Sequence, residues 1–335
     1  MDYRSLGRSG LKVSPLCLGT MLFGGRTDEA TALGMVDRAR DAGINFIDTA
    51  DQYVNGKSEE IVGRAIARQR DRWVLATKLA NKVGEGPNEG GLSRKWVLQE
   101  TDLSLKRLGT DYVDILYLHK EDHSTPLEET VSALGDVIRQ GKARYFGVSN
   151  HRSWRVAEIV RICEKLGMDR PVVSQPYYNA MNRMPEVEHL PACAHYGLGV
   201  VPYSPVARGI LTGKYQPDQP PPADSRAATN DVRIRQTEWR PESIAMAQKI
   251  KAHAERRGMT STQFALLWVL NNRFVTGAVI GPRTPEQLED YLGALKHPFA
   301  KEDEALVDGL VPSGHPSTPG YNDPAYPIEG RPTRA

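Results

Sequence analysis

The sequence predicts a (β/α)8 barrel, and three observations support that prediction. Strand-like and helix-like hydrophobic periods alternate along the chain and give eight strand–helix repeats, each too short for a core of its own. Polar residues close nearly all of the strand-like runs, whereas an open parallel sheet gathers its site at one switch point. No GxGxxG motif follows any run, so an open dinucleotide-binding sheet lacks its signature. Right-handed parallel crossovers therefore favour a closed barrel.

The first predicted element is a hairpin over residues 2–16. Weak alternation surrounds a Gly-Arg-Ser-Gly segment, in which Ser9-Gly10 supplies the turn. We expect this hairpin to plug the N-terminal mouth of the barrel. The strands that follow are short apolar runs at residues 16–20, 44–49, 73–78, 112–119, 143–149, 172–178, 198–204 and 276–281.

The helices are predicted from apolar residues that recur every three or four positions. Ser58 and Ser93 occupy expected N-cap positions, and Gly109 ends one helix. Residues 205–239 read as a long loop, and loops of that length are usually functional or disordered. The predicted helices span residues 28–42, 58–68, 93–107, 128–140, 153–166, 186–195, 242–257, 261–272, 285–294 and 301–310.

Size and composition fit one large domain and disfavour several classes of partner. The 335 residues exceed the usual size of a domain, but α/β barrels often do, and we expect a hairpin at 1–15, the barrel at 16–296 and a C-terminal helix and tail at 297–335. The net charge is +2 without any run of five like charges, so no nucleic-acid or membrane partner is expected. Three cysteines without metal-like spacing and the lack of an apolar signal core predict a cytoplasmic location. The oligomeric state is left open.

Four residues suited to acid–base chemistry close or follow the early strands. Asp48 lies at the end of the second run, Tyr53 in the loop after it, and Lys78 and His119 end the next two runs. The C-terminal ends of neighbouring parallel strands share one face, so these side chains are expected to converge.

The types of these residues indicate proton transfer. Pairing with Asp48 would keep Lys78 charged, and a nearby ammonium would stabilise the phenolate of Tyr53 and bring its acidity into range. His119 would orient a carbonyl oxygen or relay a proton. A buried lysine also serves as the Schiff-base nucleophile of barrel aldolases, and on the residues alone that alternative stays open.

Two other motifs suggest ligands by spacing only. Residues 56–58 (Gly-Lys-Ser) end like a phosphate loop, but that motif needs a glycine where Asp51 stands, so a loop and helix cap are expected. His119 and His123 have a zinc-like spacing that requires a helix, whereas their segment leaves a strand and runs into a Thr-Pro pair. We expect no metal site.

A longer pattern consists of seven segments in a fixed order: GxNFIDTADxY, ATK, LYLH, GVSN, QPYYN, VPYSPVARGILTGKY and VIGPRTPEQLEDYLGAL. Together they cover roughly residues 2 to 296 and resemble the aldo-keto reductases, most closely the bacterial branch similar to the β subunits of voltage-gated potassium channels. The resemblance implies a (β/α)8 barrel that binds NADPH (or NADP+) across its C-terminal face. The family's catalytic tetrad falls on Asp48, Tyr53, Lys78 and His119.

The resemblance also implies a set of cofactor contacts. Ser149, Asn150 and Gln175 match residues that bond the nicotinamide carboxamide, and Tyr203 matches the aromatic residue on which the ring stacks. The loop from Ser204 to Leu211 matches the segment that wraps the pyrophosphate. The full set of implied contacts outside the adenosine end is Gly19, Thr20, Met21, Asp48, Ser149, Asn150, Gln175, Tyr203, Ser204, Pro205, Val206, Arg208, Gly209, Leu211 and Gly281.

At the adenosine end, four residues match the group around the 2′-phosphate, and three of them are cations. Three cations near one dianion favour NADPH over NADH. The branch usually has Glu-Asn beneath the adenine, where this chain has Asp290-Tyr291, so Tyr291 is expected to stack or to pack. The four phosphate positions are Lys214, Arg226, Arg283 and Gln287.

The sequence therefore predicts an NADPH-dependent reductase of aldehydes or ketones, a small-molecule carbonyl substrate, and Tyr53 as the proton donor. The channel-subunit resemblance leaves open a regulatory subunit that senses NADP(H) with little turnover. The substrate pocket is expected to use Met21, Phe23, Lys120 and, if the long loop folds over, Trp239. The identity of the carbonyl compound does not follow from the sequence.

Overall fold

A computed structural model describes residues 1–229 and 231–328, which form two compact units. The first, called here the barrel unit, comprises Met1–Tyr177, Glu188–Tyr203 and Asn272–Leu292. The second unit comprises Tyr178–Val187 together with the described residues of Ser204–Asn271 and Gly293–Ala335.

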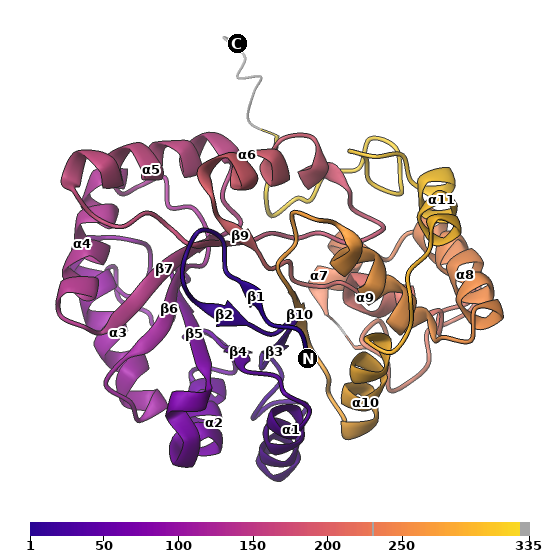
Figure 1. The fold of residues 1–335 in the computed structure, drawn as a ribbon, viewed down its shortest axis with the longest axis horizontal. Helices are drawn as coiled ribbons and strands as arrows, with labels where there is room; N and C mark the ends of the chain where they lie inside the picture. Colours follow the sequence, from indigo (N-terminus) through magenta and orange to yellow (C-terminus); the bar gives the residue numbers. More distant parts are fainter. Residues whose placement is uncertain (230, 329–335) are drawn as a thin grey trace. The chain divides into compact units, whose positions relative to one another are not determined.

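The barrel unit contains one sheet of eight parallel strands in the order β10-β3-β4-β5-β6-β7-β8-β9 (Figure 1). Its end strands β9 and β10 are joined by a parallel bridge between Val200 and Val275 and by a 2.9 Å hydrogen bond from the Val279 amide to the Pro202 carbonyl. These contacts close the sheet, so the predicted (β/α)8 barrel is confirmed. The strands are β3 (Leu16–Gly19), β4 (Phe46–Asp48), β5 (Val74–Leu79), β6 (Val113–Leu118), β7 (Ala143–Ser149), β8 (Val173–Gln175), β9 (Gly199–Val200) and β10 (Ala278–Ile280).

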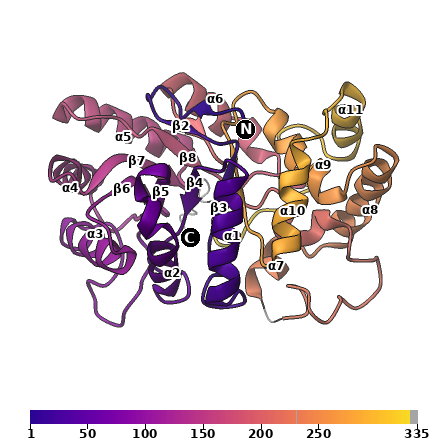
Figure 2. The same cartoon turned by 60° about the horizontal axis from the view of Figure 1, so that its bottom comes forward.

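Helices surround the outside of this sheet (Figure 2). The predicted cap of α3 is confirmed, because the Ser93 side chain accepts from the Trp96 amide and Gly109 ends the helix with a φ of 62°. The predicted cap of α2 is wrong: the N-cap is Gly56, and Ser58 is buried inside the first turn. The helices are α1 (Glu29–Asp41), α2 (Lys57–Ile66), η1 (Ala67–Arg72), α3 (Arg94–Leu108), α4 (Leu127–Arg139), α5 (Ser153–Leu166), α6 (His189–Tyr196) and α10 (Pro285–Ala294, in this unit up to Leu292).

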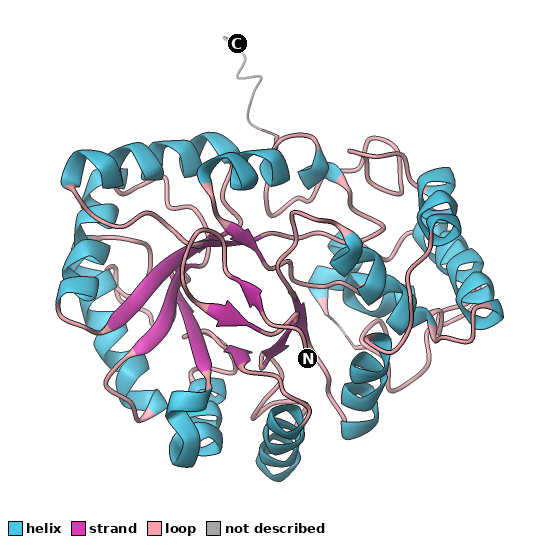
Figure 3. Ribbon diagram, in the orientation of Figure 1, coloured by secondary structure: helices cyan, strands magenta, loops and turns pink. Residues whose placement is uncertain are grey.

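The N-terminal hairpin closes one end of the barrel, as predicted. Its antiparallel strands β1 (Arg4–Ser5) and β2 (Lys12–Val13) lie across the strand ring in Figure 3. Leu6 and Val13 are fully buried in the same core as the first residues of several barrel strands. The turn differs from the prediction, because the left-handed residue is Gly7, where a Cβ would lie 2.5 Å from the Gly197 carbonyl oxygen.

The second unit is mainly helical. Trp268 is almost fully buried and packs on Tyr178, with ring centroids 5.2 Å apart. The segment 205–239 is not a plain loop, because its described residues include η3 and α7, the latter capped by the Asp231 side chain. The elements are η2 (Met184–Glu186), η3 (Ala207–Thr212), α7 (Val232–Thr237), α8 (Pro241–Arg256), α9 (Ser261–Asn271) and α11 (Lys301–Leu310). Among the described residues, no helix combines the length and the apolar character that crossing a bilayer requires.

Candidate active site

The site continues the inward-facing layers of the barrel. Side chains of a strand alternate between its two faces, so a residue two positions beyond a core residue also points inward. The barrel core contains Cys17, Phe46, Ala76, Tyr117, Val173 and Val201. Two positions further along each strand lie Gly19, Asp48, Lys78, His119, Gln175 and Tyr203. The predicted site residues therefore form the next layer, at the C-terminal ends of the strands.

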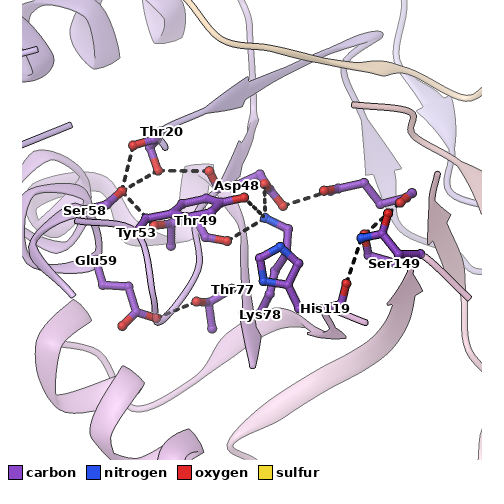
Figure 4. Close-up of polar contacts among 12 residues, drawn as sticks. Thr20, Asp48, Thr49, Tyr53, Ser58, Glu59, Thr77, Lys78, His119 and Ser149 are labelled. Carbon is purple, nitrogen blue, oxygen red and sulfur yellow. Dashed lines mark hydrogen bonds and ion pairs between the residues drawn. The ribbon is translucent and has the colours of Figure 1, made fainter. Parts of the chain in front are cut away.

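Lys78 is the centre of the tetrad (Figure 4). Its ammonium donates to the Asp48 carboxylate, to the Thr49 carbonyl at 2.8 Å and to the Tyr53 hydroxyl at 3.2 Å. Burial alone would favour a neutral lysine, but the charges and hydrogen bonds of Asp48 and Tyr53 together outweigh burial and raise the pKa of Lys78. Lys78 therefore stays charged at neutral pH. An ammonium has no lone pair for attack on a carbonyl, which argues against the aldolase alternative.

Tyr53 is held protonated. We expected Lys78 to bring the acidity of Tyr53 into range, but burial raises the pKa of Tyr53 more than the charge of Lys78 lowers it. The expected direction of the net shift was thus wrong, although the protonated phenol is the form that a proton donor needs. Val54, the next residue, has a φ of 50°, which is strained for a β-branched side chain. Such strain is typical of loops that fix a functional side chain.

His119 lies beside Tyr53 and is neutral. The two rings meet edge to face with centroids 5.8 Å apart. The His119 amide donates to the Leu79 carbonyl, and the Asn150 side chain donates to the His119 carbonyl, both at 2.9 Å. Burial and the nearby charge of Lys78 lower the pKa of His119 well below its ordinary value. A neutral imidazole can donate one hydrogen bond to a carbonyl oxygen.

The residues expected near the nicotinamide form one hydrogen-bonded chain with Asp48. Gln175 donates to Asp48 Oδ2 at 3.1 Å, and the Ser149 hydroxyl donates to the Gln175 carbonyl at 2.8 Å. Asn150 donates to the Ser149 hydroxyl at 3.1 Å and accepts from the Tyr203 hydroxyl at 2.9 Å. Amide and hydroxyl groups here offer both donors and acceptors, which is what a carboxamide requires.

The segment after β3 packs tightly against its neighbours. A Cβ on Gly19 would lie 2.6 Å from a methyl carbon of Val279. Thr20 is fully buried and bonds the Asp48 carbonyl at 3.0 Å, whereas Met21 is 39% exposed. Phe23 is fully buried, so the expectation that it lines a substrate pocket is wrong.

Further site positions of the barrel unit gather where α10 begins. The Arg283 amide donates to the Gln287 side chain at 2.8 Å, and the Thr27 hydroxyl donates to the Arg283 carbonyl at 3.0 Å. Gly281 is exposed, Asp290 is partly exposed and Tyr291 is 6% exposed. A guanidinium beside a helix N-terminus suits a phosphate group.

The remaining predicted positions belong to the second unit. Four residues with left-handed backbone bend the segment that also contains Pro205, Val206 and Leu211; they are Ser204, Ala207, Arg208 and Gly209. Each cation has a neighbour: Arg208 donates to the Thr237 hydroxyl at 3.0 Å, Arg226 pairs with Asp231 at 2.6 Å, and Lys214 lies 5.3 Å from the Tyr215 ring centroid. The expected cofactor segment is therefore folded, and its cations contact other side chains of the same unit.

Several contributors to the site were not predicted. The Ser58 hydroxyl donates to the Thr20 carbonyl at 2.8 Å and contacts the Thr49 hydroxyl at 2.9 Å, so it ties the loops after β3 and β4 together. Asn81 contacts the ring of His119. Thr49 acts through its backbone carbonyl, which a pattern of side chains along the sequence does not reveal. Asn81 lies three residues after Lys78, so a search for polar residues near the ends of predicted strands could have found it.

The metal-like motif forms no helix: residues 119–126 are bends and irregular backbone. Across residues 1–229 and 231–328, no three His, Cys, Asp or Glu side chains are grouped so that they could hold a metal ion.

Comparisons with known proteins agree on one family. The family model described as "Aldo/keto reductase family" matches residues 15–312. A "Probable voltage-gated potassium channel subunit beta" of Arabidopsis thaliana is 38% identical over 301 residues, which are 88% of this chain and 91% of that protein. The "Uncharacterized oxidoreductase YrpG" of Bacillus subtilis (strain 168) is 37% identical over 331 residues, 95% of this chain and 98% of that protein. A "Putative voltage-gated potassium channel subunit beta" of Schizosaccharomyces pombe is 38% identical over 322 residues, 93% and 90% of the two chains.

Proposed function

Because the chain belongs to the aldo/keto reductase family, we propose that this oxidoreductase reduces an aldehyde or ketone to an alcohol with NADPH. The observation that carries the proposal is the position of Lys78, whose buried ammonium contacts both the Asp48 carboxylate and the Tyr53 hydroxyl. The buried ion pair of Lys78 and Asp48 does not require a phenol beside it for structural reasons. Proton transfer, in contrast, uses the phenol of Tyr53 together with both members of the pair.

Bound NADPH would supply the hydride that adds to the carbonyl carbon. As negative charge develops on the oxygen, Tyr53 donates its hydroxyl proton, which completes the alcohol. Lys78 stabilises the phenolate that remains, and Asp48 keeps Lys78 charged. His119 donates a hydrogen bond to the same oxygen and so stabilises the developing charge. Tyr53 recovers its proton from solvent after the product leaves.

Residues of the barrel unit fit NADPH at its nicotinamide end and at its 2′-phosphate end. Ser149, Asn150 and Gln175 offer the donors and acceptors that the carboxamide of the nicotinamide requires. Arg283, at the start of α10, offers a guanidinium to a phosphate, and this supports the 2′-phosphate of NADPH over the hydroxyl of NADH.

A panel of carbonyl compounds tests the proposal, with the loss of NADPH absorbance as the signal. NADPH deuterated at the transferable hydrogen should place one deuterium on the carbonyl carbon of the product. Turnover of several aldehydes or ketones with deuterium in the alcohol supports a reductase. Absorbance loss that is unchanged without any carbonyl compound would contradict it.

A second candidate is an NADP(H)-sensing regulatory subunit, because two similar proteins are named as potassium channel β subunits. Tight NADPH binding without turnover across the whole panel would favour that candidate. The complete tetrad favours the enzyme, since sensing alone does not require a proton donor beside a buried ion pair.

A further inference from the structure

The side chain of Asn81 contacts the ring of His119. Its side-chain nitrogen Nδ2 lies 3.1 Å from His119 Nδ1. An amide nitrogen only donates hydrogen bonds, so Nδ1 is the accepting, unprotonated nitrogen of the ring. In a neutral imidazole the other nitrogen then carries the proton, which places it on Nε2.

The chain is bent to make this contact. Ala80, directly before Asn81, has a φ of 142°, a region that residues with a Cβ rarely occupy. The Ala80 carbonyl accepts from the Gly91 amide at 2.9 Å, which holds the bend in place. Strained residues of this kind persist where the surrounding structure fixes them, and they cluster at functional sites. The bend thus brings Asn81, two residues after the end of β5, to the ring of His119, the residue that follows β6.

The charges around His119 make its tautomer matter at neutral pH. Lys78 on β5 and Lys120 both disfavour a second proton on the ring, and burial acts in the same direction. The ring is therefore neutral, and only one of its nitrogens can donate. A carbonyl oxygen accepts hydrogen bonds and cannot donate them, so a lone pair at Nε2 would leave substrate and ring without a bond.

We propose that Asn81 is a positioning residue for His119, which keeps the ring proton on Nε2 so that this nitrogen donates to the substrate oxygen. The inference rests on the reductase function proposed above. It gives the loop after β5 a role in the reaction, in addition to the role of Lys78 on β5 itself, and it accounts for the strained backbone at Ala80.

Asn81→Asp is the informative substitution, because a carboxylate of nearly the same shape accepts from Nδ1 and so moves the proton from Nε2. Asn81→Leu removes the donor without supplying an acceptor, and both tautomers should then be populated. Asn88→Asp is the matched control: Asn88 is exposed in the same loop, so its substitution adds the same charge away from the ring. Each protein is labelled at histidine nitrogen, and His119 signals are assigned by loss in His119→Gln.

In the wild-type protein, nitrogen NMR should show an unprotonated Nδ1, and in Asn81→Asp a protonated one. With NADPH and the best carbonyl substrate, Asn81→Asp should lower kcat roughly 10²-fold, the usual loss on removing one donor to a developing oxyanion. Asn88→Asp should keep the wild-type tautomer and kcat. A protonated Nδ1 in the wild type, or equal losses in the two Asp variants, would overturn the proposal. The NMR result needs no substrate, so a failure of the reductase function itself would show separately as absent turnover.

Discussion

Removing the charges of Lys78 and Asp48 together tests how much proton donation by Tyr53 depends on the nearby ammonium. Lys78→Met alone would leave Asp48 as an uncompensated buried charge, so the double variant Lys78→Met/Asp48→Asn is the cleaner perturbation. The ammonium lies 3.2 Å from the Tyr53 oxygen, and at an effective dielectric constant of about 20 the attraction of a phenolate at that distance is about 5 kcal/mol. Losing this attraction alone corresponds to roughly four units in the pKa of Tyr53, and the loss of the Asp48 charge, which raises that pKa, offsets part of the change.

A transition state in which the proton is about half transferred would feel about half of the net energy, so kcat should fall by about 10-fold to 10²-fold. The assay is steady-state NADPH absorbance loss with the best carbonyl substrate, and NADPH Kd is measured by fluorescence titration. The exposed Lys106→Met serves as control. Adding Tyr53→Phe to the double variant should lower kcat little further, because these residues act as a unit. A double variant within a few-fold of wild-type kcat, or a loss confined to NADPH Kd, would refute the reasoning.

Three further predictions concern the cofactor and the fold. Arg283→Ala should weaken NADPH by roughly 1.5–3 kcal/mol and leave NADH nearly unchanged, with a smaller shift of the same kind for Lys214→Ala; equal weakening of both cofactors in fluorescence titrations would mean that Arg283 only supports its loop. Burial raises the pKa of Asp51 well above its ordinary value, so the folded state retains a proton that the unfolded chain loses as pH rises through about 4. Asp51→Asn should therefore gain stability over wild type as pH rises toward neutral, and parallel urea-midpoint curves for the two would argue against this. Gly7→Ala should destabilise the fold by about 1–3 kcal/mol, because a Cβ meets the Gly197 carbonyl, while Gly10→Ala, where nothing lies within 4 Å, should change the urea midpoint little.

Much of the barrel and the tetrad could be predicted because both follow from alternation along strands. A polar residue that closes an apolar run, such as Lys78, lies on the same face as the core residue two positions before it. That regularity places Asp48, His119 and Gln175 in one layer without any knowledge of the loops. The types of Asp48 and His119 indicated proton transfer, whereas the assignment of Gln175 to the cofactor came from the family resemblance.

The wrong predictions depend on opposing contributions to a pKa and on hydrogen-bond partners far away in the sequence. A local sequence pattern contains neither. The net shift in the pKa of Tyr53 depends on burial against the charge of Lys78, and burial is set by the whole fold. Serine is a common N-cap residue, but the hydroxyl of Ser58 instead bonds the Thr20 carbonyl and the Thr49 hydroxyl in two neighbouring loops. The helix α7 was missed because six residues between Pro-rich and polar stretches give too few apolar periods.

The central claim is that Tyr53 is the proton donor of an NADPH-dependent reduction. Its most direct test is a single-turnover measurement in which wild type and Tyr53→Phe, each saturated with NADPH, are mixed with the best carbonyl substrate. Tyr53→Phe should bind NADPH with wild-type Kd but form product at a rate that is lower by roughly 10²-fold or more, as expected for loss of a general acid. Product formation by Tyr53→Phe at close to the wild-type rate would contradict the account.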